Sequence, residues 1–125
     1  LSVVGGDKIV SGCKSGVIRM WKYDASVNSG KGGFVLSQTI HGHAREITDS
    51  VMVDNLLWSS SIDGSIRLWD LNKNGECQFA ITRDTQSNGT AVGHTAAVTG
   101  LVEFQMPNAG TFVLSSSLDG FVKVW

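Results

Sequence analysis

Cysteine, proline and surplus charge are all scarce in this chain, and each scarcity excludes a class of protein. Among 125 residues there are two cysteines and one proline, and ten basic residues face eleven acidic ones, for a net charge of −1. Cys13 and Cys77 form no Cys-x-x-Cys pair and are too few for a secreted disulfide scaffold. We therefore expect reduced thiols and a cytoplasmic or nuclear protein. The balanced charge leaves no surplus of cations for a nucleic-acid backbone or an anionic membrane.

Long hydrophobic runs are missing as well. No apolar stretch approaches the roughly 20 residues that a membrane-spanning helix needs, so we expect no membrane partner. Hydrophobic residues still make up 42% of the chain, which suffices for a packed core and excludes wholesale disorder. Glycine is abundant, at 15 residues. Together with many Val, Ile and Ser, this favours strands joined by tight turns over long helices.

An internal repeat organises the chain. Three segments align without a gap: residues 11–21, 59–69 and 115–125. Each begins with serine, has glycine at its sixth position and a basic residue at its ninth, and ends on tryptophan. Agreement at so many fixed positions excludes coincidence and indicates a repeat architecture.

Each copy of the repeat predicts a β-hairpin. Apolar and polar residues alternate with period two after the tight-turn dipeptides Asp63-Gly64 and Asp119-Gly120, as expected of strands. Further strands are predicted over residues 34–40, 47–53, 77–82 and 98–104. Four antiparallel strands per repeat make the blade of a β-propeller, so the predicted fold class is all-β.

The same residues match a known family. Gly42-His43, Ser59, Asp63 and Trp69-Asp70 resemble a complete WD40 repeat, and a second copy runs from Gly93-His94 to Trp125. The resemblance implies three repeats: residues 1–40, residues 41–82, and residues 93–125 without their last strand. Because a propeller closes with about 4–8 blades, we expect an incomplete arc. The rest of the same propeller, or another chain, is then needed to close the ring.

The resemblance also implies a structural role for eight side chains. In blades of this family, His, Ser or Thr, Asp and Trp form a buried hydrogen-bonded tetrad. Carried over by position, the two tetrads are His43, Ser59, Asp63 and Trp69, and His94, Ser115, Asp119 and Trp125. The first repeat departs from the pattern, because Ser15 stands where the turn aspartate belongs and Lys22 follows Trp21.

Catalysis and cofactor binding find little support in the sequence. The Ser, His and Asp of the tetrads recur in two repeats, which a single active site does not do, and no Gly-x-Ser-x-Gly elbow is present. His41 and His43 lack a third neighbouring metal ligand. We therefore expect no enzyme, no cofactor and no metal site.

The residues expected to bind partners follow from the interaction face that WD40 proteins commonly use. The positions before the turn aspartate, Lys14, Ile62 and Leu118, and the loop residue Arg45 are predicted to lie on that face. For Ile62 and Leu118 the alternative is simple packing against a neighbouring loop. The insertion at residues 83–92 is predicted to lie on the same face, where long loops carry specificity.

The predicted function is therefore a scaffold that mediates protein–protein interactions within a multi-protein complex. One alternative is a propeller of an RNA-associated protein, which the near-neutral charge disfavours. A second alternative is the substrate-recruiting module of a ubiquitin ligase or other enzyme. Some receptors of cullin-type ligases carry a basic residue two positions after the Trp-Asp pair, where this chain has Asn72.

Overall fold

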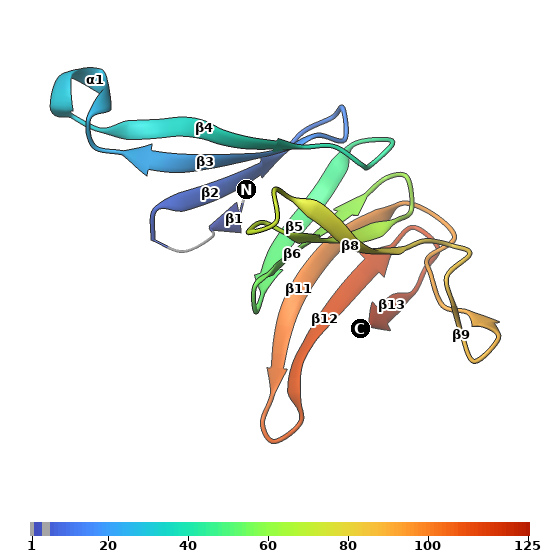
Figure 1. Cartoon of the computed structure of the whole chain (residues 1–125). Coiled ribbons are helices and arrows are strands. Elements are labelled where there is room, and N and C mark those ends of the chain that lie inside the picture. The colour runs from blue at the N-terminus through green and yellow to red at the C-terminus, as the bar shows by residue number, and fades with distance from the viewer. Residues whose placement is uncertain (1, 4–5) are drawn as a thin grey trace.

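The computed structural model describes residues 2–3 and 6–125 and consists mainly of antiparallel β-sheet (Figure 1). Leu1, where the first predicted repeat starts, lies outside the described residues. Blade 1 is made of β1 (Ser2–Val3), β2 (Lys8–Gly12), β3 (Ile18–Asp24) and β4 (Gly33–Ile40). Blade 2 is made of β5 (Ile47–Val53), β6 (Leu56–Ser61), β7 (Ile66–Asp70) and β8 (Glu76–Ile81). Blade 3 is made of β11 (Val98–Met106), β12 (Gly110–Ser117) and β13 (Val122–Val124). The all-β prediction is confirmed.

Two connections between strands have structure of their own. α1 (Val27–Gly30) joins β3 to β4, but Asn28 and Ser29 have φ of 56° and 57°, so this segment is a left-handed turn and not a helix. Between blades 2 and 3, β9 (Gln86–Ser87) pairs with β10 (Thr90–Ala91). Asn88 and Gly89, both with positive φ, form the turn that such tight hairpins favour. The insertion at residues 83–92 therefore contains a small hairpin.

Backbone geometry repeats from blade to blade as the sequence does. The pairing of β3 with β4 shifts register between Met20 and Trp21, and the pairing of β7 with β8 shifts between Leu68 and Trp69. Such β-bulges bend and twist a strand locally. In both blades the irregularity comes directly before the tryptophan of the repeat.

Hydrophobic cores form between the blades. Because successive residues of a strand face opposite sides of the sheet, β6 sends Leu57 toward blade 1 and Trp58 toward blade 3. The buried residues between blades 1 and 2 are Val10, Ile18, Met20, Ile40, Leu57 and Trp69. The buried residues between blades 2 and 3 are Ile66, Ile81 and Val98, with Trp58, Leu68, Leu101 and Trp125 packed against them. Blade 2 is thus covered on both faces.

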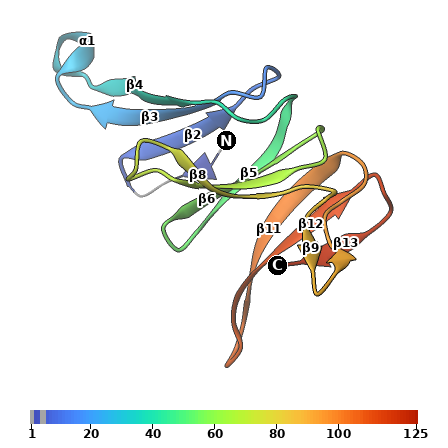
Figure 2. The same ribbon diagram turned by 45° about the vertical axis from the view of Figure 1, so that its right-hand side comes forward.

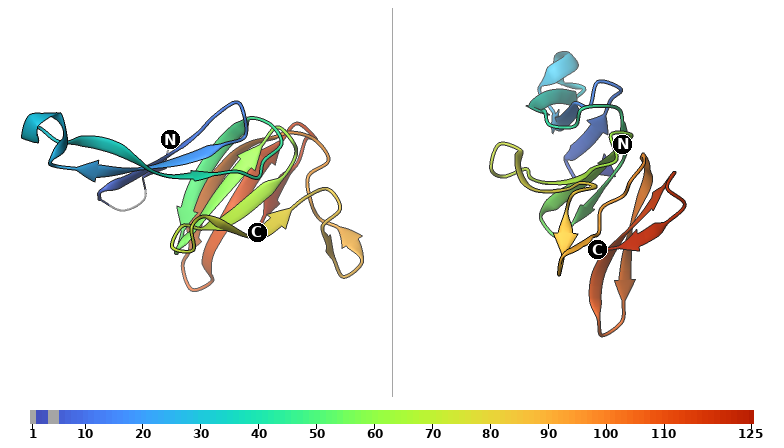
Figure 3. Two further views of the ribbon diagram at one scale, coloured as in Figure 1. Left: turned by 45° about the horizontal axis from the view of Figure 1, so that its top comes forward. Right: turned by 90° about the vertical axis from the view of Figure 1, so that its right-hand side faces the viewer.

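Polar contacts also connect blades 2 and 3. Their first strands, β5 and β11, lie side by side (Figures 1 and 3). The Thr48 hydroxyl donates to the carbonyl oxygen of Val98 (2.8 Å), and the backbone N–H of Leu101 donates to Oδ2 of Asp49 (2.9 Å). A carboxylate on one blade therefore accepts from the backbone of the next.

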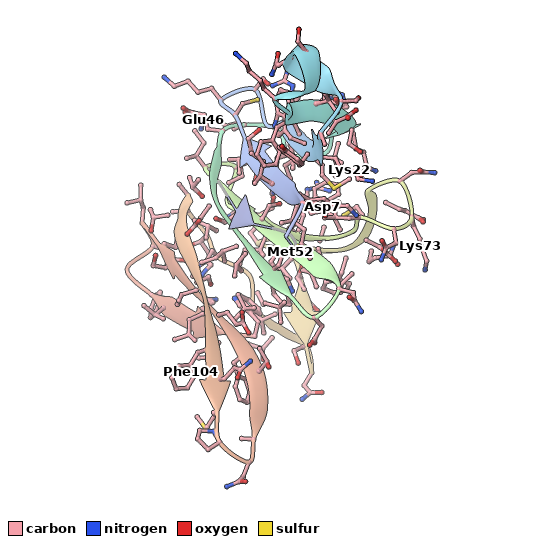
Figure 4. The ribbon with its side chains drawn as sticks, turned by 90° about the vertical axis from the view of Figure 1, so that its left-hand side faces the viewer. Asp7, Lys22, Glu46, Met52, Lys73 and Phe104 are labelled. Atoms are coloured by element: carbon pink, nitrogen blue, oxygen red, sulfur yellow. The ribbon has the colours of Figure 1, made fainter. Side chains whose placement is uncertain are left out.

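The three blades fan out as an open arc (Figure 2). Blades 1 and 2 have a fourth strand, whereas β13 forms the edge of blade 3 with no strand beyond it in the described part of the chain. Phe121 and Val122 on this edge are each 65% exposed. On the same blade, the β11–β12 hairpin projects outward and carries the exposed Phe104 (Figure 4). The expected incomplete arc is confirmed.

Gly93 offers a test of the packing between β8 and the loop before β11. A Cβ at this position would overlap the carbonyl oxygen of Thr82, whereas a Cβ on Gly6 would meet no atom within 4 Å. We expect Gly93→Ala to lower the free energy of unfolding by about 1–3 kcal/mol, because backbone must move to admit the methyl group. Gly6→Ala is the matched control and should have little effect. Urea unfolding measures both, and equal effects would contradict the packing described.

Candidate functional site

In blade 2, four side chains from different segments form one hydrogen-bonded chain. Trp69 on β7 donates its indole N–H to Oγ of Ser59 on β6 (2.8 Å). Ser59 Oγ lies 2.7 Å from Nε2 of His43, in the loop before β5. Nδ1 of His43 lies 3.3 Å from Oδ2 of Asp63, in the β6–β7 turn. The chain thus ties the loop and the turn to the two middle strands of the blade.

The direction of each hydrogen bond follows from the Trp69 end. Ser59 Oγ already accepts the indole N–H, so its own proton is available for Nε2 of His43. Neutral His43 then carries its proton on Nδ1 and donates it to the Asp63 carboxylate. Burial lowers the pKa of His43 below its ordinary value, although the Asp63 charge opposes this shift, and the lowered pKa keeps the ring neutral near pH 7.

Asp63 is held by more than the histidine. Its Oδ2 accepts the backbone N–H of Ala44 (2.8 Å), and its Oδ1 accepts both the backbone N–H (2.8 Å) and the hydroxyl (2.5 Å) of Ser65. Burial raises the pKa of Asp63, but the hydrogen bonds from Ser65 and Ala44 outweigh it. The net effect is a pKa below the ordinary 3.8.

Blade 3 repeats the arrangement with His94, Ser115, Asp119 and Trp125. Trp125 Nε1 donates to Ser115 Oγ (2.8 Å), which lies 2.7 Å from Nε2 of His94. Nδ1 of His94 lies 2.8 Å from Oδ2 of Asp119. Burial raises the pKa of Asp119, but hydrogen bonds led by that of His94 outweigh it and hold the pKa at about 2.

The two networks differ at the residue after the turn glycine. In blade 2 this residue is Ser65, whose Oγ lies 3.0 Å from Nδ1 of His43. The Nδ1–H is therefore shared between Ser65 and Asp63. Blade 3 has Phe121 at this position, and the distance between His94 Nδ1 and Asp119 is accordingly shorter, at 2.8 Å against 3.3 Å.

Blade 1 contains only one end of such a network in the part of the chain that the structure describes. Trp21 donates its indole N–H to Ser11 Oγ (2.9 Å). At the turn, Ser15 replaces aspartate, and its hydroxyl lies 2.9 Å from Sγ of Cys13. Lys14 and Ser15 at this turn are exposed, and the turn has no carboxylate to anchor a preceding loop.

Burial decides what the Ser–His–Asp sets can do chemically. Ser59 is 0% exposed and Ser115 is 1% exposed, and each hydroxyl already accepts an indole N–H. Neither oxygen reaches a substrate unless the blade opens. The sets therefore join loop, strand and turn, and expose no nucleophile.

One end of the blades, which we call the rim, carries the turns before β3, β7 and β13 and the loops before β5 and β11. The turns of blades 1 and 2 rest on the loop of the next blade. Ile47 N–H donates to the carbonyl oxygen of Cys13 (3.1 Å), and a Cβ on Gly64 would lie 3.2 Å from the carbonyl oxygen of Ala96. Glycine with positive φ at the turn makes this close approach possible.

The four residues expected to bind partners lie on the rim but differ in exposure. Lys14 is exposed, and its Nζ lies 4.0 Å from Glu46 on the loop before β5 (Figure 4). Arg45 on the same loop is exposed as well. Leu118 is 74% exposed, whereas Ile62 is half-buried and lines a cleft. The structure thus brings Lys14 close to the Arg45 loop and places Ile62 and Leu118 on separate blades.

The cleft beside Ile62 contains residues that sequence reasoning missed. It has a volume of about 450 Å³ and lies between the β6–β7 turn and the loop before β11. Arg67 and Arg83 line it. The basic ninth position of the repeat was visible in the sequence, but alignment does not show that Arg67 has a buried Nε without a hydrogen-bond partner among the described residues.

Residues 2–3 and 6–125 contain neither a cluster of metal-ligand side chains nor a membrane-spanning helix. No three His, Cys, Asp or Glu side chains in these residues gather where they could hold a metal ion. No helix in the same residues is long and apolar enough to cross a membrane.

Comparisons with known proteins agree on one family. The family described as "WD domain, G-beta repeat" matches residues 34–70 and 85–125. The Arabidopsis thaliana protein ROOT INITIATION DEFECTIVE 3 is 34% identical over 122 residues, which cover 96% of this chain and 26% of that protein. The mouse F-box-like/WD repeat-containing protein TBL1X is 31% identical over 91 residues, or 69% of this chain and 17% of that protein.

Solved structures show the same fold. The computationally designed protein Ika8 superposes with a TM-score of 0.66 at 28% identity, over 98% of this chain and 31% of that chain. This chain therefore spans about a quarter or less of the two natural relatives and about a third of the designed protein.

The network of blade 2 predicts a large effect of Asp63→Ala. We expect the free energy of unfolding to fall by about 2–4 kcal/mol, because the variant leaves the N–H and hydroxyl of Ser65 without an acceptor and removes the carboxylate that faces His43. Asp24→Ala is a matched control, since Asp24 Oδ1 also accepts the N–H and hydroxyl of the residue two positions on, but at an exposed turn. Its effect, like that of Ser15→Ala, should be several times smaller. Equal small effects would contradict the tetrad assignment.

Stability should also decrease with acid in two steps. Because the pKa of His43 is lowered in the folded protein, only the unfolded chain takes up this proton as the pH falls below about 6.5. Below about pH 4, the unfolded chain likewise takes up protons on Asp63 and Asp119 more readily than the folded protein, because the pKa values of both are lowered in the folded protein. Urea unfolding across this range measures both steps. His43→Gln should flatten the first, and an unchanged slope there would show that His43 is not neutral when folded.

Proposed function

The chain belongs to the WD40 repeat family, and on that basis we propose that it is a non-catalytic scaffold that binds protein partners through its rim. WD40 repeat proteins serve as interaction scaffolds, and the rim combines a firmly held backbone with exposed side chains. The observation that carries the proposal is a set of exposed side chains, Lys14, Arg45 and Leu118, on hydrogen-bonded rim backbone. Lys14 and Arg45 are exposed even though blades 1 and 2 are neighbours there. Leu118 N–H donates to the carbonyl oxygen of Ala97 (2.9 Å), which fixes the backbone beneath that side chain.

The proposed scaffold works inside a larger assembly. The chain covers 31% of the designed propeller, and β13 offers an unpaired edge. We propose that further repeats, or another chain, complete the ring. The repeats of this chain would then be residues 1–40, 41–82 and 93–125, the last completed by one more strand.

A cytoplasmic or nuclear location fits this proposal. Cys13 and Cys77 are both free thiols. Free thiols are typical of reducing compartments.

A second candidate function is substrate recruitment for a ubiquitin ligase. It is favoured by the name of one relative, which describes that protein as F-box-like and WD repeat-containing. Against it, the residue two positions after Trp69-Asp70 is Asn72 and not a base. The RNA-associated alternative finds no comparable support, and the net charge of −1 weighs against it.

The proposed rim predicts that Ile62→Asp combined with Leu118→Asp abolishes capture of protein partners from cell extract. Charges at these positions disrupt an apolar contact. Pull-down with mass spectrometry measures the captured proteins, and circular dichroism checks the fold. Because Ile62 is half-buried, Leu118→Asp alone is tested in parallel. Phe79→Asp is the matched control, since Phe79 is 54% exposed but lies on β8, away from the rim turns. Undiminished capture by the double variant would place the binding site elsewhere.

A further inference from the structure

Four turns of this chain combine an Asn or Asp with a following glycine. The pairs are Asp63-Gly64, Asn74-Gly75, Asn88-Gly89 and Asp119-Gly120. In such a pair the backbone nitrogen of the glycine can attack the side-chain carbonyl carbon before it and close a five-membered succinimide ring. Glycine permits this ring closure because it has no Cβ and its backbone rotates freely. All four glycines have positive φ, from 69° to 85°, so the turns alone do not distinguish the pairs.

In three of the four pairs the attacking nitrogen is already held by its own turn. The glycine N–H donates to a backbone carbonyl oxygen that precedes it in the chain. These bonds run from Gly64 to Ser61 (3.1 Å), from Gly75 to Asp70 (3.1 Å) and from Gly120 to Ser117 (3.2 Å). Ring closure at these pairs first requires the hydrogen bond to break.

The Asn74-Gly75 pair is restrained by packing as well. Gly75 is buried, and a Cβ placed on it would overlap the side chain of Ile40 on β4. The backbone at Gly75 therefore cannot rotate toward the Asn74 side chain without displacing the neighbouring blade.

The Asn88-Gly89 pair has neither restraint. Among the described residues, neither the Gly89 N–H nor the Asn88 side-chain amide makes a hydrogen bond. Both residues are exposed, and a Cβ placed on Gly89 would meet no atom within 4 Å. The nitrogen and the carbonyl carbon can therefore approach each other, and water reaches both.

The hairpin that carries this pair can also open. β9 and β10 are joined by only two residue pairs, Ser87 with Thr90 and Gln86 with Ala91. Residues 86–91 are all exposed, none of them belongs to the cores between the blades, and the hairpin reaches away from the blades (Figures 1 and 3). An isolated two-stranded hairpin is marginally stable. Local opening thus releases Asn88 from its turn conformation at little cost.

We propose that Asn88 is a site of spontaneous deamidation through a succinimide. The Gly89 nitrogen loses its proton to solvent and bonds to Cγ of Asn88, and the bond from Cγ to Nδ2 breaks as ammonia leaves. Water then adds to one of the two ring carbonyl groups. Opening the ring in this way gives aspartate or isoaspartate, and no reagent other than water is consumed.

The reaction changes the charge and the backbone of the hairpin. Residues 86–91 contain no charged side chain, and either product gives them a carboxylate. Isoaspartate also adds one methylene group to the main chain, which disturbs the pairing of Ser87 with Thr90. Because long loops on a rigid frame carry specificity, the surface between blades 2 and 3 changes as the protein ages. This inference does not rest on the proposed function.

The test follows the purified, folded protein for weeks in mildly alkaline buffer prepared with heavy-oxygen water. Tryptic peptides are then analysed by chromatography and mass spectrometry. We expect the peptide with Asn88 to exchange its amide for one labelled oxygen at least about tenfold faster than the peptide with Asn74. We also expect isoaspartate at Asn88, since direct hydrolysis of the amide yields aspartate alone.

Asn74 is the matched control within the same molecule, because it too precedes glycine. In urea both pairs should react at similar rates, since the folded structure no longer protects Asn74. Asn88→Gln should give no product on this timescale, because glutamine would have to close a less favourable six-membered ring. Equal rates at Asn74 and Asn88 in the folded protein, or no isoaspartate at Asn88, would overturn the proposal. Both results come from the wild-type protein, so neither depends on whether a variant folds.

Discussion

Blades 2 and 3 each depend on satisfying one largely buried aspartate at a tight turn. A buried carboxylate is unfavourable unless donors surround it. Asp63 obtains these donors from its own turn through Ser65, from the preceding loop through Ala44, and from His43. Because His43 is in turn bonded to Ser59, and Ser59 to Trp69, the turn cannot move without disturbing the central strands. Blade 1 lacks the turn aspartate, so in the described residues its network is limited to the hydrogen bond from Trp21 to Ser11.

Stacking of blades is the second requirement, because one sheet has two apolar faces. Blade 2 buries Leu57 toward one neighbour and packs Trp58 toward the other. Blade 3 has a neighbour on one side only, and residues such as Phe121 and Val122 remain exposed. The same alternation that creates a core between two blades therefore leaves an uncovered face wherever the arc is open.

The rim can present side chains to a partner because the stacked blades hold its turns and loops in place. Turn and loop backbones are fixed by hydrogen bonds to one another, so side chains at their tips are presented in defined positions. Side chains at equivalent positions then differ in their contacts. Lys123 donates hydrogen bonds to backbone carbonyl oxygens, whereas the buried Nε of Arg67 has no hydrogen-bond partner among the described residues. Equivalent positions of the repeat can therefore make different hydrogen bonds in different blades.

Much of the fold was predictable from sequence, because its signals are local. Alternating apolar residues, the Asp-Gly turns and the spacing of His, Ser, Asp and Trp determined the strands, the hairpins and the family. Other features depend on how the backbone of one blade approaches the next. The contact of Asp49 with Leu101, the cleft, and the difference between Arg67 and Lys123 are of this kind. Tertiary structure alone decided them, since a hydrogen bond depends on where a distant carbonyl or amide group lies, and the repeat pattern does not specify that distance.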